Sequence, residues 1–156
     1  MPGFPSSPKP GFLSAFGHQL NAAPLPTPLR FMPFATLLRV GTTLAFSSDH
    51  PAADLNPWTG IASAVARADR FGRAILGDEA ISVHAAIKAY TANAANRLGI
   101  DAGHIEPGAP ADLVWVHPDP FTCPSDQLVA TATLLTWSGG TVRYASTDSG
   151  FKGPSK

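Results

Sequence analysis

Several features that mark common protein classes are scarce in this sequence. Only one cysteine, Cys123, occurs among the 156 residues, which excludes an internal disulfide framework and a cysteine-based zinc site and is typical of a reducing compartment. The 11 Lys and Arg residues balance the 11 Asp and Glu residues, so the sequence lacks the basic surplus of nucleic-acid binders. No apolar run approaches the roughly 18 residues that cross a bilayer. We therefore expect a cytoplasmic protein with no nucleic-acid partner and no membrane partner.

Some familiar motifs are also missing. Ser47 and Ser48 are not flanked by the glycines of a Gly-x-Ser-x-Gly elbow, which disfavours a serine hydrolase. No glycine-rich phosphate loop occurs. Polar residues interrupt the apolar positions between residues 11 and 23, so we expect no signal peptide there.

What the chain does have is enough apolar material for one compact core, since 44% of its residues are hydrophobic. Prolines crowd residues 1–29 and disfavour helix at the positions before them. We expect this segment to be an extended or disordered arm. The polar residues 147–156 lack periodicity, which predicts a disordered tail.

Apolar periodicity predicts three helices. Residues 31–40 suit a short helix that stops before Gly41. Apolar residues recur at helical spacing from Ile61 to Ile75, which predicts a helix ending near Gly77. Residues 83–98 carry one apolar stripe, preceded by Ser82 as an N-cap and followed by Gly99 as a stop.

Extended structure is predicted in two places. Residues 42–46 read as a strand buried on both faces. In the last third, residues 113–116 form a β-rich run, and residues 129–137 and 141–145 flank Gly139 and Gly140, a pair that suits a tight hairpin. The C-terminal third is therefore predicted to be a small β unit.

The buried run at residues 42–46 leads to Asp49 and His50. In α/β barrels the residues at the C-terminal ends of strands form the active site, which makes Asp49 a candidate catalytic residue. An aspartate in a proline-containing turn can equally accept backbone hydrogen bonds and cap that turn. His50 is either a substrate-binding residue beside Asp49 or a turn residue in water.

Five pieces in order resemble the C-terminal end of a metal-dependent amidohydrolase of amidohydrolase family 3, the group with N-substituted formamide deformylase-like enzymes. The resemblance covers residues 30–144. Its pieces are Ser48-Asp49-His50-Pro51, a helix with Arg67, a helix with Tyr90-Thr91, the Gly- and Pro-rich residues 103–113, and residues 136–144 with Gly139-Gly140.

The resemblance implies an α/β fold: a partial TIM-barrel end, with the last strand and its flanking helices, plus a small β-sandwich-like unit. Residues 30–100 would be the C-terminal part of the barrel, with residues 42–46 as its eighth strand. Residues 101–146 would be the β unit, in which Asp112 has a structural role only.

The resemblance also implies a chemistry. Asp49 would lie beside one or two divalent metals, zinc being the expected ion, and would take a proton from the attacking water. A metal can lower the pKa of bound water to about 7, and a nearby carboxylate can accept its proton. The implied activity is hydrolysis of non-peptide carbon-nitrogen bonds in a small amide.

The family's remaining metal ligands are not found in this sequence. No two of its 5 histidines are separated by a single residue, so the His-x-His pair is missing. We expect a C-terminal fragment without strands one to seven, inactive alone, in which Asp49 is a metal ligand only if another chain supplies the rest. The alternative is a non-catalytic remnant or interaction module that pairs through exposed strand edges, with itself or with a complementing barrel fragment.

Overall fold

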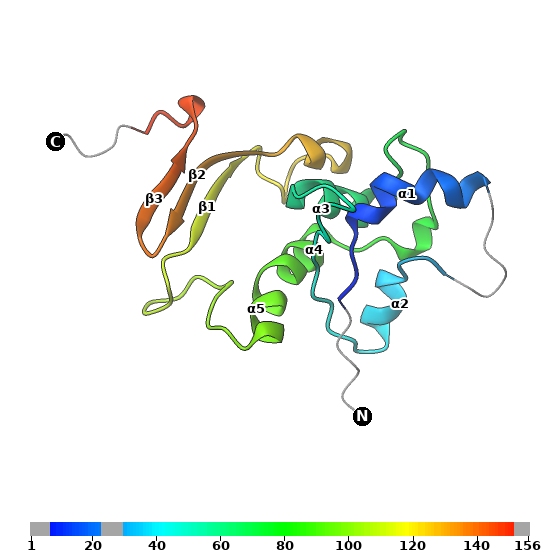
Figure 1. The fold of residues 1–156 in the computed structure, drawn as a ribbon, viewed down its shortest axis with the longest axis horizontal. Coiled ribbons are helices and arrows are strands. Elements are labelled where there is room, and N and C mark those ends of the chain that lie inside the picture. The colour runs from blue at the N-terminus through cyan, green and yellow to red at the C-terminus, as the bar shows by residue number, and fades with distance from the viewer. Residues whose placement is uncertain (1–6, 23–29, 152–156) are drawn as a thin grey trace.

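Short helices lie beside a three-stranded antiparallel sheet in the computed structural model, which describes residues 7–22 and 30–151 (Figure 1). The chain is thus of mixed α and β structure. No helix of the described part has the length and apolar character to cross a membrane. The elements are α1 (Gly11–Ala22), α2 (Phe34–Arg39), α3 (Pro57–Ala66), η1 (Gly77–Glu79), α4 (Val83–Tyr90), α5 (Ala92–Leu98), β1 (Leu113–His117), η2 (Ser125–Ala130), β2 (Ala132–Ser138), β3 (Thr141–Ala145) and η3 (Thr147–Ser149).

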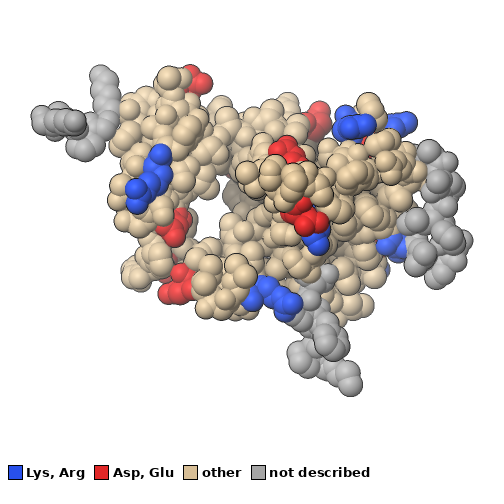
Figure 2. All heavy atoms as spheres, in the orientation of Figure 1, with Lys and Arg blue, Asp and Glu red and all other residues tan. Residues whose placement is uncertain are grey.

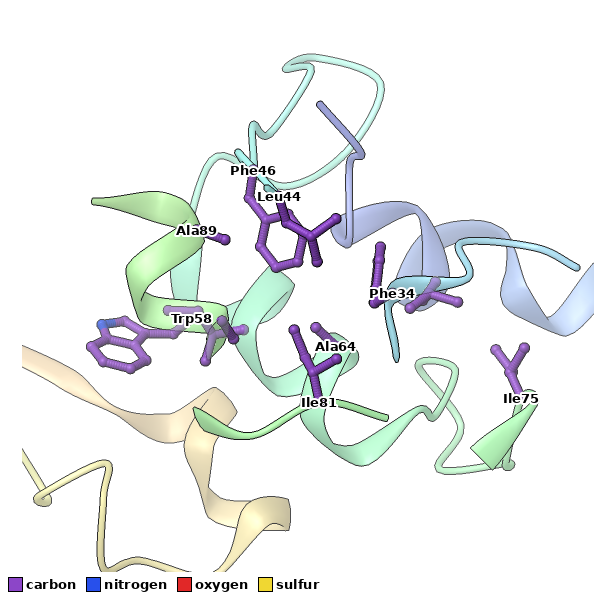
Figure 3. Packing of buried hydrophobic residues seen from close by; sticks show 11 residues of the cluster. Phe34, Leu44, Phe46, Trp58, Ala64, Ile75, Ile81 and Ala89 are labelled. Carbon is purple, nitrogen blue, oxygen red and sulfur yellow. The ribbon is translucent and has the colours of Figure 1, made fainter. Parts of the chain in front are cut away.

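The hydrophobic core lies among the helices, and the extended residues 42–46 run through it. Figure 3 shows Leu44 and Phe46 among side chains from α2, α3 and α4. The Phe46 ring contacts those of Phe34 and Tyr90, with centroids 5.1 and 5.4 Å apart. Aromatic pairs at this separation stabilise a core beyond the area that they bury.

The expected strand at residues 42–46 is extended, and all of it except Thr43 is buried. It belongs to no named sheet, because the sheet of the described residues consists of β1, β2 and β3. The partial barrel is therefore not seen in these residues. Buried backbone groups still need hydrogen-bond partners. Here the Phe46 N–H donates to the Ala89 carbonyl and the Ser47 N–H to the Pro8 carbonyl.

Helix α3 begins where its sequence predicts and ends earlier. The Asn56 side chain accepts a hydrogen bond from the Trp58 N–H, and Pro57 occupies the first turn, both of which favour a helix start. The prediction that this helix continues to Gly77 is wrong. It ends at Ala66 because Arg67 adopts a left-handed conformation, and a short hairpin pairs Ala68 with Ala74.

The helix predicted from Ser82 to Gly99 forms in two pieces. The Ser82 side chain caps α4 by accepting from the Ala85 N–H, and Gly99 ends α5 with a φ of 68°. Both end signals are confirmed. The continuous stripe is not, because Thr91 leaves the helical conformation, with φ −114° and ψ −100°, and separates α4 from α5.

The expected arm at residues 1–29 contains regular structure. Residues 11–22 form α1, which packs against α3, so the prediction of an arm without secondary structure is wrong there. Residues 1–29 contain seven prolines, and none of them lies within α1 itself. In the expected tail, residues 147–149 form a 3-10 turn. Residues 1–6, 23–29 and 152–156 lie outside the described part of the chain.

The small β unit is confirmed as a sheet in the order β1-β2-β3. Gly139 and Gly140 form its tight turn with φ values of 55° and 74°, the left-handed geometry that a type I′ hairpin requires. Asp112 supports this turn, since its Oδ1 accepts from the Gly139 N–H at 2.8 Å. The structural role expected for Asp112 is thus confirmed.

Candidate functional site

Asp49 lies at the end of a buried segment. Leu44, Ala45 and Phe46 are 1%, 3% and 5% exposed, whereas the Asp49 side chain is 48% exposed. The backbone turns sharply here, because Asp49 has a φ of 56°, which aspartate tolerates better than most residues. The fold therefore carries one carboxylate from the core to the surface.

The turn that follows is stabilised by other side chains. The Ser48 Oγ accepts from the His50 N–H at 3.3 Å, and the Asp54 Oδ1 accepts from the Asn56 N–H at 3.0 Å. Within residues 7–22 and 30–151, no backbone N–H donates to the Asp49 carboxylate. Its ionic neighbour is Lys9, whose Nζ lies 3.9 Å from Oδ2. The capping role considered for Asp49 is thus filled by Ser48 and Asp54.

His50 is exposed beside Asp49, and its ring makes no hydrogen bond within the described part of the chain. Its neighbour Asp54 has a different task. The pKa of Asp54 lies below its usual value, chiefly because of the hydrogen bond from the Asn56 backbone and then that from Thr59, with a smaller effect of the His50 charge. Asp54 therefore serves the start of α3, whereas the Asp49 carboxylate has only the ion pair with Lys9 among the described residues.

The described residues alone do not fit a metal ion. Across this part of the chain, no three His, Cys, Asp or Glu side chains are grouped as ligands, whereas catalytic zinc sites use three protein ligands. The nearest ionic neighbour of Asp49 is the ammonium of Lys9, a cation. Asp49 could contribute to a metal site only together with ligands from elsewhere.

A buried carboxylate that the sequence analysis missed lies under α2. Glu79 is 0% exposed and accepts from the Thr36 N–H and Oγ1, at 2.8 and 2.6 Å, and from Arg30 at 3.0 Å. Burial alone would raise the pKa of Glu79, but these hydrogen bonds outweigh it and hold the pKa below its usual value. The acidic pair Asp78-Glu79 was the only sequence signal for this cluster.

Arg67, part of the expected family motif, is also 0% exposed. Its guanidinium donates to the carbonyls of Phe31, Met32, Ile75 and Leu76, at 2.9 to 3.2 Å. It also lies over the Phe34 ring at 5.4 Å. Arg67 therefore joins α2 and the hairpin to α3, which is a structural role.

Charge and cavities are not concentrated at Asp49. Figure 2 shows Lys and Arg in several small groups, and Asp and Glu in others, spread over the visible face. The larger cavity, about 560 Å³, lies between α1, α3 and η2 and is lined by Ser14, Ser63, Asp69 and Val129 among others. Its lining residues include neither Asp49 nor His50.

The described residues thus form a mixed α and β fold in which a buried run leads to a half-exposed aspartate. Residues 10–144 match the sequence model of the amidohydrolase family. This chain therefore belongs to the amidohydrolase family. The match begins at residue 10, so it includes part of the proline-rich segment that we expected to lie outside the resemblance.

Two individual proteins support the assignment. N-substituted formamide deformylase from Arthrobacter pascens is 32% identical over 123 residues, which are 78% of this chain and 23% of that protein. The crystal structure of an amidohydrolase from Thermotoga maritima superposes with a TM-score of 0.55 at 25% identity, over 72% of this chain and 26% of the other. The chain thus spans about a quarter of each relative.

Proposed function

We propose that this chain contributes Asp49 to the active site of an amidohydrolase that cleaves a carbon-nitrogen bond in a small amide. Asp49 would accept a proton from the attacking water, and His50 would contact the substrate beside it. The proposal rests on the observation that Asp49 follows a buried segment, is half exposed and caps no turn. A half-exposed carboxylate that caps no turn is available for proton transfer.

The proposed site is completed by residues from outside this part of the fold. The relatives are about three times as long as this chain, and the described residues lack a three-ligand metal site. Amidohydrolases are in general metal-dependent, and a zinc ion would supply Lewis-acid activation of water and carbonyl. Its other ligands would come from the remaining strands of a barrel, of which residues 42–46 would be the last.

A chimera tests the role of Asp49 without requiring this chain to act alone. In the Arthrobacter pascens enzyme, the 123 aligned residues would be replaced by their counterparts from this chain. We expect the chimera to hydrolyse an N-substituted formamide, and Asp49→Asn to lower kcat at least about 100-fold, the usual contribution of a general base.

Asp101→Asn is the matched control, because its carboxylate is 80% exposed and lies on a loop remote in sequence from Asp49. We expect it to leave kcat unchanged. An Asp49→Asn chimera as active as its parent would refute the proposal. The isolated chain should retain no stoichiometric zinc after loading with the metal. Stoichiometric zinc that is lost in the Asp49→Ala variant would show that the chain builds its own site.

A further inference from the structure

The extended residues 42–46 have hydrogen-bond partners along both edges. On one edge the Ser47 N–H donates to the Pro8 carbonyl. On the other the Phe46 N–H donates to the Ala89 carbonyl at 2.9 Å, and the Leu44 carbonyl accepts from the Asn93 Nδ2 at 2.9 Å. The second edge is therefore bonded to helices α4 and α5 rather than to a strand.

The interruption at Thr91 makes this bonding possible. In a continuous helix the Ala89 carbonyl would accept from the N–H four residues later, at Asn93. Because α4 ends at Tyr90 and α5 begins at Ala92, the Ala89 carbonyl accepts from Phe46 instead. The same break directs the Asn93 side chain at Leu44.

Gly103 packs directly on the break. A Cβ at this position would lie 2.5 Å from the Thr91 carbonyl carbon and from the Ala92 nitrogen, closer than any side chain allows. Gly103 also has a φ of +80°. The loop after α5 therefore fits against the break only with glycine here, which fixes the corner between the helices.

We propose that this helix corner is an edge cap: the Ala89 carbonyl and the Asn93 amide close the edge of residues 42–46 against pairing with a second copy of the chain. An uncapped extended edge is a template for another strand. A cavity of about 270 Å³ lies beside this edge and is lined by Thr43, Lys88 and Asn93 among others. The proposal concerns this chain by itself: in the barrel of the proposed function the same edge would pair with a neighbouring strand, and the helix corner would first have to leave it.

A matched pair of substitutions tests the edge cap. Asn93→Asp keeps the shape of the side chain but removes the N–H donor and places a carboxylate against the Leu44 carbonyl. Asn96→Asp makes the same change at an exposed position of the same helix. We expect Asn93→Asp to raise the self-association constant about tenfold, measured by light scattering over a concentration series, and Asn96→Asp to leave it at the wild-type value.

A second substitution separates edge pairing from general misfolding. Thr43 is exposed on the segment, and a lysine on a strand edge opposes pairing. Adding Thr43→Lys to Asn93→Asp should return the association constant to the wild-type value, and amide exchange at Phe46 should be faster than in wild type. Unchanged association in Asn93→Asp would overturn the proposal. The proposal would also be overturned if Thr43→Lys failed to lower the self-association of the Asn93→Asp variant. The same holds if Thr43→Lys abolished self-association of the wild-type chain.

Discussion

Replacing Arg67 by methionine would remove the buried cation that joins three parts of the helical region. The aliphatic stem would be kept, but the hydrogen bonds to four carbonyls and the contact with Phe34 would be lost. Hydrogen bonds to charged groups contribute about 1.5–3 kcal/mol each, although some freed carbonyls can regain water. Breaking buried charged networks by removing one partner costs about 3–5 kcal/mol, and we expect a loss of this size in the free energy of unfolding.

The measurement is urea denaturation followed by tryptophan fluorescence, which reports on Trp58 of the core and on Trp115 and Trp137 of the sheet. Arg70→Met is the control, because Arg70 is exposed and contacts only the nearby Phe71 ring among aromatic side chains of the described part. It should change the unfolding free energy by less than about 0.5 kcal/mol. Arg67→Lys keeps the charge but loses the planar fork, so its loss should be intermediate. A loss below about 1 kcal/mol for Arg67→Met would refute the assigned role.

Three further predictions concern single residues. The pKa of Glu79 is lowered in the folded chain. Its charge therefore stabilises the fold at pH values above the unfolded pKa, and this stability is lost as the pH falls. Glu79→Gln should make the free energy of unfolding depend less on pH in the acid range. Burial raises the pKa of Tyr90 to about 12, so stability should fall between pH 10 and 12, and Tyr90→Phe should remove the latest phase of an ultraviolet titration. Gly103→Ala should lower the melting temperature more than Gly108→Ala, because both have positive φ but only Gly103 meets backbone.

Local signals in the sequence predicted the ends of several elements. Ser82, Gly99 and the Gly139-Gly140 pair act through neighbouring backbone, and each has the predicted geometry. Such positions are readable from sequence because their hydrogen bonds or φ angles depend on a few adjacent residues. The candidate Asp49 followed from the same local pattern, a buried run that ends in a polar turn.

The errors arose where distant contacts decide the conformation. Helix α3 stops at Ala66, where the Arg67 side chain donates hydrogen bonds to the carbonyls of Phe31 and Met32, more than thirty positions earlier. The break at Thr91 fits against Gly103 and directs Asn93 to Leu44, 49 positions earlier. Apolar periodicity continues across both points, so it could not show that the helix ends.

The contact between Lys9 and Asp49 has a practical consequence for anyone who makes this protein. A fusion partner or affinity tag placed before Lys9 would enter the fold next to the one carboxylate assigned to chemistry. The opposite end of the described chain leaves from the β3 side of the sheet, away from the helices (Figure 1). Tags, fluorophores and surface tethers should therefore be attached at the C-terminus, so that Asp49 remains accessible to substrate and to any added polypeptide.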